Sequence, residues 1–205
     1  MITKNSYVPL FVAIAVTTVA LLIGLVFRKP YQFHGTIITP PLLLSDFSLQ
    51  TANNESFRLS EQQGKIVLLF FGYTNCPDVC PITLGTFKQA YERLGEDAQN
   101  VKFVMITADP ERDTPDKVAA YAARFNPEFI GLGGNLKDLQ RLWKELGVFV
   151  EKQESDSAAG YLVSHTASVY VLDQNGSLIM TLPYGTSAID IANDVSELLK
   201  QSERE

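Results

Sequence analysis

Apolar residues occur along this chain in one long uncharged run near the N-terminus and in several shorter runs separated by polar patterns. The long run, residues 7–27, has no charged side chain and matches the roughly 20 residues that a helix needs to cross a bilayer. It is longer than the apolar core of a usual signal peptide, and it continues into Phe27-Arg28-Lys29-Pro30 without a typical cleavage site. We therefore expect a single retained membrane span rather than a cleaved signal peptide.

Two further alternatives for this run are a buried core helix and a mitochondrial targeting segment. The second is disfavoured because the run lacks an Arg-rich amphipathic pattern. Lys4 and the terminal amine on one side balance Arg28 and Lys29 on the other, so the charge count alone does not orient the span.

Breaks in the pattern mark the next segment, residues 30–41, which we interpret as an irregular juxtamembrane connector. The residues that break it are proline and glycine: Pro30, Gly35, Pro40 and Pro41. The sequence thus predicts an N-terminal tip and membrane anchor at 1–29, the connector at 30–41, and one folded domain at 42–205.

Strand patterns recur through the predicted domain. Short segments on either side of residues 51–55 predict a hairpin. The charge-free run 66–71 and the segment 101–107 predict buried strands, whereas 167–172 and 177–182, joined through Asn175-Gly176, predict a second hairpin.

Helical patterns lie between these strands. One has its apolar face at Leu84, Phe87, Tyr91 and Leu94 and stops at Gly95, and another starts at Thr114-Pro115 and continues to Phe125. Two more cover 136–146 and 187–199. The order β-α-β-α-α-β-β-α predicts an α/β fold with a mixed sheet, whose first two long strands are parallel, whose last pair is antiparallel and whose faces both carry helices. Thioredoxin-like folds have this layout.

Charge and length change the picture only slightly. The chain of 205 residues has room for one domain of ordinary size plus an appendage. Its formal net charge is -6, and it has neither a cluster of Lys and Arg nor a basic stripe among aromatic residues, so we expect no nucleic-acid partner.

Candidate chemistry is concentrated at Cys76 and Cys80, the only cysteines of the chain, in the sequence Cys-Pro-Asp-Val-Cys-Pro. They lie where the buried strand 66–71 leads into a helix. Thiols at this spacing can meet across one tight turn, either in a disulfide or around a shared metal ion. Pro77 and Pro81 bias each preceding cysteine away from helical geometry, so we expect Cys80 at or just before the helix start and Cys76 in the loop. Unpaired amides at a helix start favour the reactive thiolate.

Two structural interpretations of the cysteines compete with a functional one. A disulfide between them would close a very small loop and stabilise the fold little, because the entropy removed from the unfolded chain grows with loop length. Two buried free thiols fit poorly with a loop that contains prolines.

His165 is the candidate third ligand, because it directly precedes the predicted strand 167–172, whose start faces the cysteine loop in a thioredoxin-like sheet. Two thiolates and one imidazole suit copper, since sulfur selects the monovalent ion and imidazole accommodates the divalent one, whereas structural zinc normally takes four ligands. We expect His34, the other histidine, to be solvated, and Met105 and Met180 to lie in the core.

The turn at 109–115, Asp-Pro-Glu-Arg-Asp-Thr-Pro, follows the second parallel strand at the carboxyl edge of the sheet, where α/β folds place their sites. It can serve either as a helix cap with a charged turn or as part of the site, and the sequence leaves both open.

Three segments together resemble the Sco family of membrane-anchored copper proteins, which serve assembly of the copper site in cytochrome c oxidase. They are 71–81 around the cysteines, the turn at 109–115, and 163–166 around His165, and the resemblance runs from about residue 42 to 199. It implies a thioredoxin-like domain that binds one copper ion, Cu(I) or Cu(II), through Cys76, Cys80 and His165. His165 would then occupy the place where thioredoxins have a cis-proline. Asp78 is expected to tune the charge of the site and Asp113 to orient its loop.

The resemblance also implies a place in the cell and a partner. The N-terminal tip would be cytoplasmic, and the domain would be periplasmic, held at the bacterial inner membrane by one helix. The expected recipient is the copper-site subunit of cytochrome c oxidase or another extracytoplasmic copper protein.

Three functions follow as hypotheses. The first is copper delivery, and the second is a thiol-disulfide oxidoreductase that uses Cys76 and Cys80 as a redox pair to reduce the cysteines of a partner's copper site. The third, peroxide reduction or redox sensing, rests on analogy of fold alone.

Overall fold

The computed structural model describes residues 8–26, 30–157 and 160–202, and these divide into two compact units with the boundary between Gln32 and Phe33. The first unit contains one helix, α1 (Val8–Val26), in the segment where the sequence predicts a membrane span. Within the described residues, however, no helix combines the length and the apolar character that crossing a membrane requires. The predicted span is therefore not confirmed, and its two end residues, Tyr7 and Phe27, lie outside the described part.

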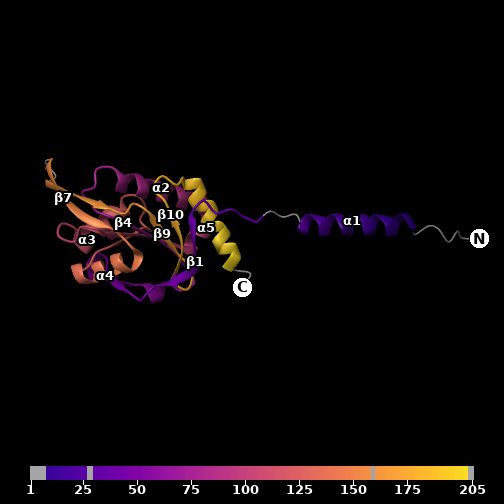
Figure 1. Ribbon diagram of the computed structural model, residues 1–205, viewed down its shortest axis with the longest axis horizontal. Coiled ribbons are helices and arrows are strands. Elements are labelled where there is room, and N and C mark those ends of the chain that lie inside the picture. The colour runs from indigo at the N-terminus through magenta and orange to yellow at the C-terminus, as the bar shows by residue number, and fades with distance from the viewer. Residues whose placement is uncertain (1–7, 27–29, 158–159, 203–205) are drawn as a thin grey trace, which may run out of the picture. The chain divides into compact units, whose positions relative to one another are not determined.

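A six-stranded mixed sheet forms the centre of the second unit (Figure 1). Its strands, in order across the sheet, are β1 (Thr36–Leu43), β10 (Ser177–Leu182), β9 (Val169–Leu172), β4 (Ile66–Gly72), β5 (Val101–Thr107) and β6 (Ile130–Leu132). The strands β4, β5 and β6 are parallel, whereas β9 is antiparallel to both β4 and β10. The predicted mixed sheet is thus confirmed, including its parallel first pair and its antiparallel last pair.

Four helices pack on this sheet: α2 (Val79–Leu94), α3 (Pro115–Ala123), α4 (Leu136–Leu146) and α5 (Ala188–Ser202). Their ends follow local chemistry. The hydroxyl of Thr114 accepts a hydrogen bond from the Lys117 amide at the start of α3, and Gly147 ends α4 in the left-handed conformation with φ 67°. Three short 3-10 turns complete the helical structure of the described residues: Ala52–Asn54, Leu59–Gln62 and Gly95–Asn100.

The core lies on both faces of the sheet because the side chains of each strand alternate between the faces. In β4 all residues are buried; Leu68 and Phe70 pack with α2, α3 and α5, whereas Leu69 and Phe71 pack with α4. A small hairpin of β2 (Ser48–Gln50) and β3 (Ser56–Arg58), as predicted, adds to the α4 side. The prediction of helices on both faces is therefore confirmed.

Four strands lie where the sequence predicted none. The strand β1 replaces the expected irregular structure from Thr36 onward; its two prolines fit because β1 is at the sheet edge and its register shifts between Ile37 and Leu42. The strand β6 is too short to have a visible pattern. The strands β7 (Val150–Ser157) and β8 (Gly160–His165) form a separate two-stranded sheet, and Figure 1 shows β7 reaching out from the layers of the domain.

Candidate metal centre

The junction between β4 and α2 positions the two cysteines. After Gly72 the chain turns, with the Cys76 amide donating to the Tyr73 carbonyl at 3.2 Å, and α2 begins at Val79. Cys80 is therefore in the first turn of the helix and Cys76 in the loop before it, as predicted. The Cys80 amide donates to Cys76 Sγ at 3.4 Å, so an unpaired amide of the helix start points at the sulfur.

Gly72 makes room for the inner sulfur. A Cβ at this position would lie 2.9 Å from Cys80 Sγ and 2.8 Å from Cε1 of Phe70. Both of these side chains are fully buried, so neither has space to move away. A residue without a side chain is thus required where the strand meets the thiol.

His165 brings its ring to the cysteines from the end of β8. Its Nε2 lies 3.7 Å from Cys80 Sγ, and its Nδ1 lies 3.1 Å from the Thr166 carbonyl. A hydrogen bond from Nδ1–H to this carbonyl leaves the lone pair of Nε2 directed at the sulfurs. The ring packs edge-on against Phe70 and Tyr73, at centroid distances of 5.9 and 6.0 Å. His165 is therefore close to the predicted place, but it belongs to a hairpin strand rather than to the connection just before β9.

The ligand atoms of Cys76, Cys80 and His165 all lie within 4.8 Å of one another. Over the described ranges, this is the one group of three or more Cys, His, Asp or Glu residues with metal-binding geometry. Two sulfurs and one nitrogen form a soft donor set, and three ligands fall short of the four that structural zinc normally takes. The donor set therefore fits copper.

The two thiols have different protonation behaviour. Hydrogen bonding from Cys80, together with His165 and the amides of Asp78 and Cys80, lowers the pKa of Cys76 to about 4, although burial acts against it. The interaction with Cys76, followed by burial, raises the pKa of Cys80. At neutral pH the pair thus has one thiolate, on the half-buried Cys76, and one protonated thiol inside the domain.

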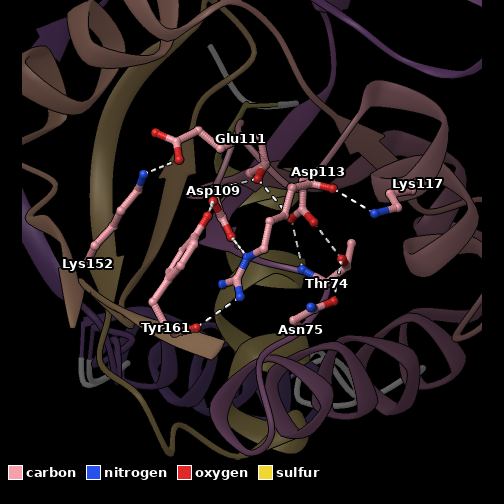
Figure 2. Close-up of polar contacts among 10 residues, drawn as sticks. Thr74, Asn75, Asp109, Glu111, Asp113, Lys117, Lys152 and Tyr161 are labelled. Atoms are coloured by element: carbon pink, nitrogen blue, oxygen red, sulfur yellow. Dashed lines mark hydrogen bonds and ion pairs between the residues drawn. The ribbon is translucent and has the colours of Figure 1, made fainter. Parts of the chain in front are cut away.

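The turn at 109–115 serves both of the roles that the sequence left open. Thr114 caps α3, while Asp113, whose side chain is buried, accepts hydrogen bonds from the Thr74 amide at 2.9 Å, the Thr74 hydroxyl at 2.5 Å and the Thr107 hydroxyl at 3.0 Å (Figure 2). Thr74 lies in the loop that leads to Cys76. Asp113 therefore makes the contacts with the cysteine loop that a residue orienting this loop needs. Asp78, by contrast, is exposed at the start of α2.

The other sequence candidates lie outside the centre. Met105 and Met180 are buried in the core, as predicted. His34 is more than a solvated residue: its Nδ1 lies 2.9 Å from the buried Asp194 and its Nε2 lies 3.2 Å from Asp190, both on α5. Residues that the sequence interpretation missed are Tyr73, which packs on His165, and Arg112 and Tyr161, which join the turn to β8. The spacing of these residues along the chain gave no signal of their contact.

The fold and the donor set define a class: a thioredoxin-like domain in which a histidine joins the cysteine pair to form a soft-metal site. The chain belongs to the SCO1/SenC family, whose model matches residues 36–200. It is similar to the solution structure of apo Sco1 from Thermus thermophilus, with 36% identity and a TM-score of 0.72 over 85% of this chain and 99% of that one. It is also similar to Bradyrhizobium japonicum ScoI with copper bound, with 30% identity and a TM-score of 0.70 over 77% of this chain and 99% of that one.

Among proteins known by sequence, the SCO2-like protein of Rickettsia felis is 35% identical over 135 residues, which cover 65% of this chain and 66% of that protein. The chain therefore spans about two thirds of the length of this relative.

Proposed function

We propose that this protein binds one copper ion as cargo through Cys76 Sγ, Cys80 Sγ and His165 Nε2 and delivers it to the copper site of cytochrome c oxidase or of another extracytoplasmic copper protein. The observation that carries the proposal is the convergence of the three donor atoms within 4.8 Å. The similarity to a family member solved with copper bound supports the choice of metal.

The unequal exposure of the two sulfurs suits a transfer function. Cys76 is half-buried and next to a surface cavity lined by Pro77, Asp78 and His165, whereas Cys80 is fully buried. An incoming or outgoing ion therefore meets the Cys76 thiolate first, and a partner thiolate can replace it before the inner ligands release the ion. Because Cys80 retains its proton in the free protein, copper binding releases a proton, and copper affinity rises with pH.

We further propose that the domain works outside the cytoplasm and is associated with a membrane. A lipoprotein of the SCO1/SenC family from Bacillus anthracis, 25% identical with a TM-score of 0.66, supports this location. Attachment through residues 7–27 stays a prediction of the sequence; the expected result is that the full chain sediments with membranes and a chain lacking these residues does not.

Copper titration of the purified, reduced full chain against a competing chelator tests the main proposal. One equivalent is expected to bind, and His165→Ala is expected to weaken binding by more than about 100-fold, because a lost ligand exceeds the effect typical of a lost second-shell partner. His34→Ala is the matched control, since it removes the other histidine of the chain, which pairs with α5. Unchanged affinity in His165→Ala would remove His165 from the site.

A second function, thiol-disulfide exchange, is favoured by the lowered pKa of the accessible Cys76. The Cys76 thiolate would attack one sulfur of a partner disulfide, forming a mixed disulfide and releasing the other partner sulfur as a thiolate. Cys80, passing its proton to the partner thiolate already released, would then attack Cys76 Sγ and release the second partner sulfur as a thiolate, so that two electrons pass from this protein to the partner.

Two variants of the ligands separate the two functions. His165→Ala is expected to lose copper binding and to retain exchange with a disulfide-bonded peptide, whereas Cys76→Ser is expected to lose both. Equal loss of exchange in the two variants would argue against a separate reductase function.

A further inference from the structure

Within the described residues, the hairpin that carries His165 pairs with no strand of the central sheet, so its base and its side chains attach it to the domain. Its register runs from Val150 opposite His165 outward, and its base is tied by hydrogen bonds between Phe149 and Thr166 at 2.9 and 3.0 Å. Tyr161 and His165 lie on the same face of β8, because side chains two or four positions apart in a strand point the same way. A contact that fixes Tyr161 therefore also fixes the rotation of the strand that carries the imidazole.

Arg112, in the turn after β5, makes that contact. Its Nη1 donates to the Tyr161 carbonyl at 2.9 Å, and its guanidinium carbon lies 3.6 Å from the centroid of the Tyr161 ring. Its Nε contacts Asp109, and the Tyr161 hydroxyl donates to the same carboxylate at 2.8 Å (Figure 2). The three side chains thus form a closed set in which each contacts the other two.

The charges in this set are shielded from water. The side chain of Asp109 is 1% exposed and that of Arg112 is 19% exposed. Burial and the hydrogen bond to Asp109 raise the pKa of Tyr161 to about 12, so its hydroxyl remains a donor at neutral pH. A second contact between the turn and the hairpin, from Glu111 to Lys152 of β7, joins two side chains that are 61% and 45% exposed, and we expect water and salt to weaken it.

One turn therefore holds both parts of the metal centre. Asp113 binds the loop before Cys76 through Thr74, and Arg112 with Asp109 binds the strand before His165 through Tyr161. We propose that Arg112, Asp109 and Tyr161 are positioning residues that hold the His165 hairpin against the cysteine loop and so set the distance between the imidazole and the sulfurs. This inference rests on the proposed copper function.

Conservative variants test the proposal without emptying a buried site. Tyr161→Phe keeps the ring over the guanidinium and removes the hydroxyl donor, and Arg112→Lys keeps the charge and removes the planar, two-sided contact. We expect each to weaken copper binding by about 10-fold, the lower end of the effect of second-shell partners on metal sites, and to shift the copper-thiolate absorption. The reduction potential of the Cys76–Cys80 disulfide is expected to stay unchanged in Tyr161→Phe, because the hydroxyl that this variant removes donates to Asp109 in the turn. The guanidinium carbon of Arg112 also lies 5.8 Å from the centroid of the Tyr73 ring in the cysteine loop, so a small shift of the potential is expected in Arg112→Lys.

Two comparison variants complete the design. Arg58→Lys alters a guanidinium that pairs with Asp46 at 3.0 Å on the β2–β3 side of the domain, and it is expected to leave both copper affinity and potential unchanged. Asp113→Asn alters the hydrogen bonds to Thr74 and is expected to change both the copper affinity and the reduction potential. Thermal unfolding of each variant checks that it folds.

Three results would overturn the proposal. The first is wild-type copper affinity and absorption in both Tyr161→Phe and Arg112→Lys, and the second is a loss of affinity in Arg58→Lys equal to that in these two variants. The third is a shift of the reduction potential as large in Tyr161→Phe as in Asp113→Asn. If the wild-type protein binds no copper, the proposed function fails, but the positioning can still be measured in the metal-free protein. Amide exchange in β8 is then expected to speed up in Tyr161→Phe and Arg112→Lys, and unchanged exchange would overturn the positioning proposal by itself.

Discussion

The cysteine half and the histidine half of the metal centre are held by different kinds of interaction. Cys80 follows a central strand whose residues are all buried, and it packs in the core between the sheet and α2. Within the described residues, His165 ends a two-stranded sheet whose strands pair only with each other. This sheet contacts the domain through the His165 ring on Phe70 and Tyr73, through the apolar side chains of Val150 and Val163, and through contacts of Tyr161 with the turn at 109–113.

Because of this difference, the positions of the sulfurs and of the imidazole depend on different parts of the structure. The sulfur positions depend on core packing, so a change there alters the fold as well as the site. The imidazole position depends on contacts that are each worth about 1 to 3 kcal/mol, so it can vary while the fold persists. A carrier that must both hold and release a metal ion gains from such an arrangement, because its affinity can change without unfolding.

Amide hydrogen exchange offers the largest contrast between the two halves. An isolated two-stranded hairpin is marginally stable in water, whereas central strands open only with the whole domain. We expect the amides of β7 and β8 to exchange at least about 100-fold faster than those of β4 and β5, which corresponds to about 3 kcal/mol. Exchange measured by NMR or mass spectrometry on the reduced protein checks this.

The same exchange experiment with copper added tests whether the ion links the two halves of the centre. One equivalent is expected to slow exchange in β8 and to leave β4 nearly unchanged, because the ion joins His165 of the hairpin to the two cysteines. Equal exchange in β4 and β8 of the metal-free protein would break the comparison.

Substitution of Gly72 tests the cysteine half. In Gly72→Ala the new methyl group would meet the buried Phe70 and Cys80 at 2.8 and 2.9 Å. Overpacking of a filled core destabilises proteins by about 1 to 3 kcal/mol. We expect a loss of about 2 kcal/mol in the free energy of unfolding by urea, together with weaker copper binding, since the thiol must move.

Gly85→Ala is the matched control. Gly85 lies in α2, and a Cβ there would have no atom within 4 Å. Because alanine is the better helix former, this variant is expected to be about 0.5 to 1 kcal/mol more stable with unchanged copper affinity. If Gly72→Ala has the stability and the copper affinity of the wild-type protein, packing does not fix the position of the Cys80 thiol.

The sequence predicted the parts of the fold whose signals are local. The uncharged run of β4, the Asn-Gly turn before β10 and the period of α4 each depend on neighbouring residues, and each is found where expected. The edge strands β1 and β6 depend on pairing with distant partners. At β6, moreover, Gly131 is needed because a Cβ would lie 2.2 Å from the Val118 carbonyl of α3, a contact that no local pattern indicates.

The site divides in the same way. The spacing of Cys76 and Cys80 is enough to predict that the two thiols lie close together. The position of His165 near them can be predicted once the order of the strands is known. The contact of Arg112 with Tyr161 joins residues 49 positions apart in the chain, and Tyr161 lies in a hairpin whose first strand, β7, is polar. It could not be predicted from one sequence because neither residue type nor spacing requires the two to meet.

The segment before β1 resembles the His165 hairpin in being held to the core by polar contacts. The buried carboxylate of Asp194 on α5 accepts hydrogen bonds from the amides of His34 and Gly35, at 3.0 and 3.1 Å, and from the His34 ring at 2.9 Å. If polar contacts hold this segment as they hold the hairpin, the strength of its attachment should depend on the protonation of one side chain, whereas the packing of the core should not.

The hydrogen bond to Asp194, followed by the charges of Asp194 and Asp190, raises the pKa of His34, although desolvation acts against it. A histidine whose pKa is higher in the folded than in the unfolded state stabilises the fold below the unfolded value of about 6.5, and this contribution disappears as the pH rises through the folded value. We therefore expect wild-type protein to lose more stability than His34→Gln between pH 5.5 and pH 8.5, measured by urea unfolding at each pH. Because His34 is exposed, this is the smallest of the expected effects. An identical pH dependence in the two proteins would show that the charge of the His34 ring does not contribute to the attachment, and that the hydrogen bonds from the amides of His34 and Gly35 to Asp194 do not need it.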